Sequence, residues 1–176
     1  MEKKSPTIWF TGLSASGKTT LSTQLYNDLN NLGIENVVLL DGYAIRDKLK
    51  NNNFDTDNRE EMGFQKAKLA LELNDSGKIV LISGIAHKRK WRNDIRNMLE
   101  NYFEIFLDCS VESCIKRDYK GHYQKAISGK LNNFIGITES YEISDKYDLI
   151  LDTGKLSIEF CSAKILKTVL DFIKEE

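Results

Sequence analysis

The chain has 176 residues, of which 41% are hydrophobic and 29% are charged, values typical of a globular protein with a sizeable core. Its 25 Lys and Arg residues almost balance its 26 Asp and Glu residues, leaving a formal net charge of −1. This balance argues against nucleic acid or a membrane as a partner, since both attract strongly basic chains. No apolar run approaches the ~20 residues of a membrane span, and the N-terminus lacks the apolar segment of a secretory signal. Its three cysteines lack metal-ligand spacing, so we expect a reduced, cytoplasmic protein.

Short apolar segments alternate with helical patterns along the chain. Strands are predicted at residues 7–11, 37–40, 79–82, 103–107 and 147–151. Leucines at helical spacing from Leu21 to Leu32 predict the first helix, which Gly33 ends. Further helices are predicted at residues 57–74, 88–100 and 157–174.

Residues 120–143 differ from the rest, because glycine and asparagine interrupt them and their periodicity is weak. We expect a lid at about 119–142, since irregular surface segments of this kind often close over substrates. Most predicted strands are apolar throughout, which is typical of a parallel sheet covered on both faces. The expected fold is therefore a single α/β domain over residues 1–176. It would hold a five-stranded parallel sheet with helices on both faces.

In such folds the ligand binds beyond the carboxyl ends of the strands. Polar residues collect at the predicted ends, among them Thr11, Asp41, Ser83 and Asp108. Asp108 has two open interpretations, a water-mediated contact to Mg²⁺ or only a helix cap.

Residues 12–19, GLSASGKT, match the phosphate-loop pattern G-x-x-x-x-G-K-[ST] between a predicted strand and a predicted helix. Glycines let the backbone curl around a phosphate, and the helix N-terminus adds positive potential. Lys18 is expected to reach the β and γ phosphates of ATP, and the Thr19 hydroxyl to bind Mg²⁺. The sequence thus predicts a P-loop NTPase fold. The residues expected to hold ATP are Gly12, Ser14, Ala15, Ser16, Gly17, Lys18, Thr19 and Thr20.

A phosphate loop by itself does not separate a kinase from a GTPase switch or a motor ATPase. Three features favour a kinase of small molecules. The chain is short, the Asn-Lys-x-Asp sequence of GTPases is missing, and Asp41 ends the second predicted strand. A carboxylate there could accept the proton of an acceptor hydroxyl. A GTPase switch stays as the weaker alternative.

Longer motifs resemble the adenylylsulfate (APS) kinase family over nearly the whole chain, from residue 8 to about 170. GLSASGKTT at residues 12–20 resembles the family's phosphate loop, and Leu40-Asp41-Gly42 followed by Arg46 resembles its Leu-Asp-Gly-Asp-x-x-Arg segment. The most specific match is KGHYQKA at 120–126, followed by NFIGI at 133–137. These runs resemble the family's lid sequences Lys-Gly-Leu-Tyr-Lys-Lys-Ala and Asn-Phe-Thr-Gly-Ile.

The resemblance implies Mg²⁺-dependent transfer of the ATP γ-phosphoryl group to the ribose 3′-hydroxyl of adenosine 5′-phosphosulfate. The product would be 3′-phosphoadenylyl sulfate, an intermediate of sulfate assimilation. It further implies that Asp41 is the general base and a water-mediated Mg²⁺ contact, that Lys18 is catalytic, and that Arg117 packs on the ATP adenine. The acceptor would be held by Arg46, Phe54, Arg59, Arg89, Lys125, Phe134 and Ile135. The family is often dimeric, so the resemblance admits a homodimer, although no feature of the sequence defines an interface.

Three departures from the family pattern fall on the acceptor side. Tyr43 replaces the second Asp of Asp-Gly-Asp, residues 61–65 read EMGFQ instead of Glu-Asn-Ile-Arg-Arg, and residues 85–87 read IAH instead of Ile-Ser-Pro. Losing two arginines beside an anionic acceptor would remove charge-assisted hydrogen bonds. Two alternatives therefore stand beside APS. One is the same reaction on another nucleotide such as cytidine diphosphoramidate, and the other is a nucleotide-binding paralogue without kinase activity.

A basic stretch covers residues 87–92, HKRKWR, ahead of Arg96. It could steer an anionic substrate, but we favour a solvated helix face, with Arg89 alone singled out by the resemblance. The cysteines are expected to be small buried hydrophobes.

Overall fold

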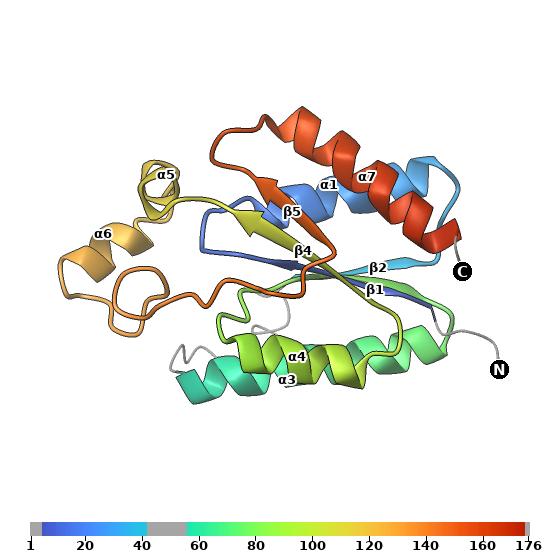
Figure 1. Cartoon of the computed structure of the whole chain (residues 1–176), viewed down its shortest axis with the longest axis horizontal. Coiled ribbons are helices and arrows are strands. Elements are labelled where there is room, and N and C mark those ends of the chain that lie inside the picture. The colour runs from blue at the N-terminus through green and yellow to red at the C-terminus, as the bar shows by residue number, and fades with distance from the viewer. Residues whose placement is uncertain (1–4, 42–55, 175–176) are drawn as a thin grey trace.

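The computed structural model describes residues 5–41 and 56–174. Within them, five strands form one parallel sheet in the order β2-β3-β1-β4-β5 (Figure 1). This confirms the predicted five-stranded parallel sheet. The strands are β1 (Thr7–Thr11), β2 (Val37–Asp41), β3 (Ile79–Ser83), β4 (Tyr102–Asp108) and β5 (Leu149–Asp152).

Four strands run further at their carboxyl ends than the apolar segments predicted, because parallel pairing continues onto polar residues. Asp41 pairs with Ser83, and Asp108 pairs with Asp152. The polar residues predicted to follow these strands are therefore held in register by the sheet itself. This places their side chains at one fixed edge, where ligands bind in folds of this class.

The fifth strand begins two residues later than predicted, although the Asp148 N–H still donates to the Glu104 carbonyl at 2.9 Å. The Tyr147 ring packs against Phe106, with centroids 6.3 Å apart. The Asp148 carboxylate accepts the backbone N–H of Glu104 at 2.7 Å and a guanidinium N–H of Arg96 at 2.9 Å.

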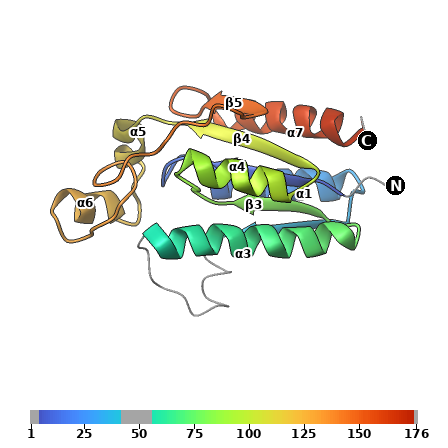
Figure 2. The ribbon, with the colours of Figure 1, turned by 60° about the horizontal axis from the view of Figure 1, so that its bottom comes forward.

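Helices cover both faces of the sheet (Figures 1 and 2). On one face α1 (Lys18–Asn31) packs against α7 (Ile158–Lys174). On the other face α3 (Thr56–Asp75) packs against α4 (Arg89–Met98). No helix in residues 5–41 or 56–174 is long and apolar enough to cross a membrane.

Each face of the sheet has its own hydrophobic core. Under α1, Leu21, Leu25 and Leu29 are at most 3% exposed, as their spacing predicted. Leu32 was predicted on the same stripe but is 57% exposed. The helix ends before it, and the chain turns at Gly33 with φ +82°.

A third, smaller core lies beyond the carboxyl ends of the strands, where two short helices project from the sheet (Figure 2). These helices are α5 (Val111–Lys116) and α6 (His122–Ile127). The rings of Tyr123 and Phe134 meet edge to face there, with centroids 4.8 Å apart. Neither helix was predicted, because a helix of six residues presents too few apolar positions to show a period.

The helix-cap interpretation of Asp108 is wrong for α5. The cap is Ser110, whose hydroxyl accepts the backbone N–H of Ser113 at 3.2 Å. The expectation for the cysteines is confirmed, since all three are buried free thiols: Cys109, Cys114 and Cys161.

Asn74, near the end of α3, joins this helix to the amino ends of two strands. Its buried side chain accepts a hydrogen bond from the Thr7 hydroxyl at 2.7 Å. Its amide donates to the carbonyls of Pro6 at 3.1 Å and Lys78 at 3.0 Å. One side chain thus fixes α3 against the starts of β1 and β3.

Asn74→Ala is expected to lower the free energy of unfolding by about 2–3 kcal/mol, because it leaves buried polar groups without partners. Urea denaturation measures the change. The matched control is Asn36→Ala, which removes one exposed hydrogen bond to the Gly77 carbonyl and should cost no more than about 0.5 kcal/mol. Equal losses in the two variants would contradict the bracing role of Asn74.

Candidate active site

The phosphate loop has a backbone conformation that few side chains allow. Gly12, Ala15 and Gly17 have positive φ angles of 143°, 60° and 100°. A Cβ atom at Gly12 would lie 2.6 Å from the carbonyl oxygen of Leu107 and 2.9 Å from Oγ of Ser16. Only glycine therefore fits where the loop leaves β1 against β4. The loop leads directly into the N-terminus of α1, which is a favourable place for a phosphate.

Lys18 begins α1 and turns back over the loop. Its ammonium donates a hydrogen bond of 2.5 Å to the Leu13 carbonyl. Burial, with a smaller contribution from the positive charge of Lys66, lowers the pKa of Lys18 to about 8, although Cys114, Cys109 and Asp41 oppose the shift. The loop therefore holds a partly desolvated cation, which a phosphate anion would stabilise in its charged form.

A cavity of about 900 Å³ opens at the carboxyl edge of the sheet. The phosphate loop lines it from residue 14 to residue 20, together with Asp41 and Ser83. The Thr19 and Ser83 hydroxyl oxygens lie 3.5 Å apart, and Ser83 pairs with Asp41 in the sheet. The predicted lysine, hydroxyl and carboxylate therefore face one space of the size that small-molecule sites have.

Arg117 adds a flat cation to the cavity wall. Its guanidinium donates to the Thr153 carbonyl at 2.6 Å, and the Thr153 hydroxyl donates to the Ser16 carbonyl at 2.9 Å. These bonds tie the loop after β5 to the phosphate loop. Leu156 and Ile158, which are partly exposed, line the cavity as well. A guanidinium among apolar side chains is suited to stacking on a nucleotide base.

Arg59 and His87 line the cavity from α3 and from the loop after β3, with Glu139 beside them. The two carboxylate oxygens of Glu139 lie 3.9 Å from Nη1 of Arg59 and 3.2 Å from Nε2 of His87. Burial lowers the pKa of His87 to about 4, against the opposing effect of Glu139, so this imidazole is neutral at pH 7. Arg59 is therefore the cation of this group, and Glu139 is its anionic neighbour.

The 119–142 segment supplies Lys125, Phe134 and Ile135 to the cavity, as predicted. Phe134 and Ile135 are buried, whereas Lys125 is exposed. The Tyr123 hydroxyl donates to the Ser14 carbonyl at 2.9 Å, so the segment rests on the phosphate loop itself. The edge-to-face contact with Tyr123 also fixes the orientation of the Phe134 ring.

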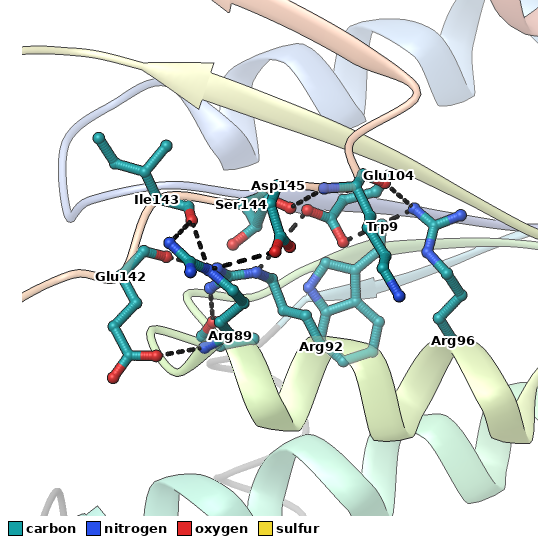
Figure 3. A network of polar contacts seen from close by, with 12 residues as sticks. Trp9, Arg89, Arg92, Arg96, Glu104, Glu142, Ile143, Ser144 and Asp145 are labelled. Carbon is teal, nitrogen blue, oxygen red and sulfur yellow. Dashed lines mark hydrogen bonds and ion pairs between the residues drawn. The ribbon is translucent and has the colours of Figure 1, made fainter.

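Three residues singled out in the sequence, Tyr43, Arg46 and Phe54, lie outside the described residues. Arg89 is described, but the structure does not bring it to the cavity. Its guanidinium donates to the Ile143 carbonyl at 3.2 and 3.1 Å and lies 3.7 Å from the Asp145 carboxylate (Figure 3). Arg89 thus holds the chain just after the 119–142 segment.

The solvated helix face predicted for the basic stretch is wrong on the side of α4 that faces β4. Arg92 is 2% exposed and lies 3.7 Å from the Glu104 carboxylate, which is equally buried. Arg92 also donates to the carbonyls of Ala86 and Glu142, and Arg96 pairs with Asp148 (Figure 3). These arginines share one helix face and bind the returning chain, so they are structural clamps rather than solvated charges.

Tyr141, at the end of the same segment, reaches the strand that carries the phosphate loop. Its hydroxyl lies 2.7 Å from the Thr11 hydroxyl, and its ring stacks on Phe106 with an interplanar angle of 7°. The Arg92 guanidinium lies 5.2 Å from the centre of the Tyr141 ring. The segment is therefore anchored at both ends near the phosphate loop, through Tyr123 and Tyr141.

Phe64 and Gln65, the residues that stand where the family pattern has two arginines, do not line the cavity. Phe64 packs into the core with Trp9, and the Gln65 amide donates to the Glu61 carboxylate at 2.6 Å on the surface. Met62 does line the cavity and is 3% exposed. Among the described residues, the acceptor-side differences that line the cavity are Met62, Gly63, Ala86 and His87.

Sequence reasoning did not single out Lys66, and it included His87 only in a basic stretch and in a departure from the family pattern. Both are buried and both line the cavity. The one available signal was the position of Lys66 on α3, four residues after Met62 and seven after Arg59, which places the three on one helix face.

Thr19 and Asp41 offer oxygen ligands, the kind that Mg²⁺ prefers. Among residues 5–41 and 56–174, no three His, Cys, Asp or Glu side chains gather as a metal site. Mg²⁺ commonly takes one or two protein ligands and completes its shell with water and phosphate oxygens. The residues present therefore fit an ion that binds together with a nucleotide.

A parallel sheet with a phosphate loop at its central strand, facing a cavity with a carboxylate and further cations, is the arrangement of a P-loop kinase. The family model for adenylylsulphate kinase matches residues 4–152. The adenylyl-sulfate kinase of Synechococcus sp. is 36% identical over 170 residues, which cover 96% of each chain. The chain therefore belongs to the adenylylsulphate kinase family and is a phosphotransferase with an alcohol group as acceptor.

Two further comparisons bear on the acceptor. The structure of the Mycobacterium tuberculosis APS kinase CysC in complex with AMPPNP and APS matches with a TM-score of 0.86 and 30% identity, covering 97% of this chain and 98% of that one. The cytidine diphosphoramidate kinase of Campylobacter jejuni is 35% identical over 147 residues, covering 84% of this chain and 85% of that protein. Relatives at similar identity thus carry names with different acceptors.

The lowered pKa of Lys18 predicts pH-dependent nucleotide binding. Above pH 8 the free protein loses the Lys18 proton, and a phosphate must restore it, so affinity falls as pH rises. The dissociation constant for MgATP should increase roughly tenfold between about pH 7.5 and pH 9. Isothermal titration calorimetry measures it, with Lys18→Met as the control that should lose this dependence. The same affinity at both pH values would contradict the prediction.

Proposed function

We propose that this protein transfers the γ-phosphoryl group of MgATP to the ribose 3′-hydroxyl of adenosine 5′-phosphosulfate. The observation that carries the proposal is one cavity lined both by Lys18 of the phosphate loop and by Arg59 and Phe134, with Asp41 on the same wall. A donor and an acceptor nucleotide can therefore meet beside a carboxylate. The breadth of the family match supports the same reaction.

On the donor side, the backbone of residues 12–17 and the Lys18 ammonium would hold the β and γ phosphates. Arg117 would stack on the adenine, with Thr153 fixing its guanidinium. Thr19, and Asp41 through water, would hold Mg²⁺, which neutralises phosphate charge when bound. Thr20 borders the cavity beside them.

On the acceptor side, Arg59 would bind an anionic group and Phe134 would stack on the base, with Ile135 and Lys125 completing the wall. Arg46 and Phe54 belong to this proposal through the family resemblance alone. Asp41 would take the proton of the attacking hydroxyl, and most of the rate enhancement would come from positioning and charge stabilisation. The 119–142 segment would act as the lid of this single kinase domain.

A second candidate acceptor is cytidine diphosphoramidate. The Campylobacter jejuni relative is known by that substrate, and it is about as similar to this chain as the adenylyl-sulfate kinases are. Met62, Ala86 and His87 line the cavity where the family pattern has other residues, so the acceptor pocket differs in shape and polarity. The donor side is common to both candidates.

A mass-spectrometric assay with MgATP tests the choice by offering APS beside cytidine diphosphoramidate and nucleoside 5′-diphosphates. The proposal expects APS to gain one phosphate with the highest kcat/KM of the panel. Turnover of the cytidine acceptor with inert APS would overturn the APS assignment and favour the second candidate. No transfer to any acceptor would overturn the kinase proposal for this cavity.

Asp41→Asn is expected to lower kcat at least ~10²-fold, because the amide cannot take the hydroxyl proton. The control is Asp152→Asn, which changes a carboxylate at the carboxyl end of β5, on the opposite edge of the sheet; Asp152 does not line the cavity. Steady-state kinetics with saturating acceptor measure both variants. Near-normal turnover of Asp41→Asn would exclude the general-base role.

A further inference from the structure

Lys66 lies midway along α3, on the helix face turned to the cavity. Arg59, Met62, Gly63 and Lys66 all line the cavity, and the steps of three and four residues from Arg59 to Met62 and from Met62 to Lys66 are those of one helix face. The Lys66 side chain is only 7% exposed. Lysines are rarely buried to this degree, because removing an ammonium from water is costly unless charges or dipoles compensate. Its place in a cavity wall therefore calls for an explanation beyond helix propensity.

The Lys66 ammonium reaches the carboxyl end of β3, next to the phosphate loop. It donates a hydrogen bond of 3.2 Å to the Ser83 carbonyl, and Ser83 Oγ lies 3.5 Å from Thr19 Oγ1. Gly84 provides the space, since a Cβ there would lie 3.4 Å from the Lys66 nitrogen and 3.2 Å from the Trp9 ring. The Trp9 indole N–H in turn donates to the Gly84 carbonyl at 3.2 Å, which holds the strand end in place.

Lys66 and Lys18 are two buried ammonium groups on one cavity, close enough that the charge of Lys66 contributes to lowering the pKa of Lys18. Like charges in a partly desolvated space disfavour each other until an anion binds between or beside them. Lys18 belongs to the phosphate loop, whereas Lys66 shares its helix face with Arg59. The two cations therefore flank the cavity from the donor and the acceptor walls.

We propose that Lys66 is a specificity-determining residue that binds the anionic 5′ group of the acceptor nucleotide. This inference rests on the proposed function, because it concerns the acceptor half of the same cavity. The family pattern has arginines at positions 64 and 65 of α3. In this chain these positions hold Phe64, which packs into the core, and Gln65, which lies on the surface. Lys66 supplies positive charge from the helix face that does line the cavity. An acceptor without negative charge near its 5′ position is then disfavoured.

The test compares Lys66→Met and Lys66→Gln with Lys68→Met, which removes the same charge from the exposed side of the same helix. Lys66→Gln keeps a donor for the Ser83 carbonyl, so it remains informative if Lys66→Met fails to fold, which thermal melting detects. Calorimetry with protein saturated with MgADP measures the dissociation constants of APS and of cytidine 5′-diphosphate. For whichever of these acceptors binds wild-type protein, both Lys66→Met and Lys66→Gln should raise the dissociation constant at least ~10-fold. Lys66→Arg should restore most of this affinity, and Lys68→Met should stay within about twofold of wild type.

Acceptor affinity within about threefold of wild type in the folded Lys66 variants would overturn the inference. It would also fall if MgADP affinity dropped as much as acceptor affinity, since Lys66 would then serve the donor or the fold. Failure of the proposed function gives a different pattern. In that case wild-type protein phosphorylates no acceptor. The calorimetric comparison of wild-type and Lys66 variants still shows whether Lys66 binds the nucleotide anion.

Discussion

The structure depends on one steric constraint, the close approach of the phosphate loop to strand β4 at Gly12. A side chain at Gly12 would collide with the Leu107 carbonyl at 2.6 Å, so the loop can leave the central strand only through glycine. This turn delivers Lys18 to the start of α1, and Lys18 then reaches back to the Leu13 carbonyl. A buried cation, a free helix N-terminus and the ends of four other strands are thereby gathered at one edge of the sheet.

The 119–142 segment uses the same loop as its support. Tyr123 binds the Ser14 carbonyl, Tyr141 meets Thr11 at the end of β1, and Phe134 packs on Tyr123. Beyond the segment, the arginines of α4 hold the returning chain against β4 (Figure 3). A movement of this segment would therefore displace groups that contact the phosphate loop. In a kinase, such contacts are a physical means of coupling acceptor binding to donor binding.

Much of this architecture follows from local sequence. The phosphate loop and the apolar strands are contiguous patterns, and the fold they predict is the one observed. The burial of Arg92 could not be read in this way, because its partner Glu104 is in a strand and its carbonyl acceptors are in two other loops. Lys66 resembles any surface lysine until α3 is placed against β3. The positions of Phe64 in the core and Gln65 on the surface could not be predicted from the sequence either, since the side on which a helical residue lies depends on how the helix is rotated in the fold.

The part of the cavity beside Arg59, which is the acceptor half in the proposed function, is where this chain departs most from the family pattern. Met62, His87 and Lys66 line it beside Arg59, and none of the first three was expected to bind anything. The donor half keeps every element of the phosphate-loop pattern. In the proposed function, phosphoryl transfer takes place near Lys18, and charge and shape along α3 and the loop after β3 would decide which acceptor binds.

A crystal structure with a non-hydrolysable ATP analogue, Mg²⁺ and APS tests the central claim most directly. The account predicts that the Lys18 ammonium leaves the Leu13 carbonyl and lies within hydrogen-bond distance of the β and γ phosphates. The acceptor ribose should then lie beside Asp41. A nucleotide bound elsewhere, with Lys18 still on the Leu13 carbonyl, would contradict the account.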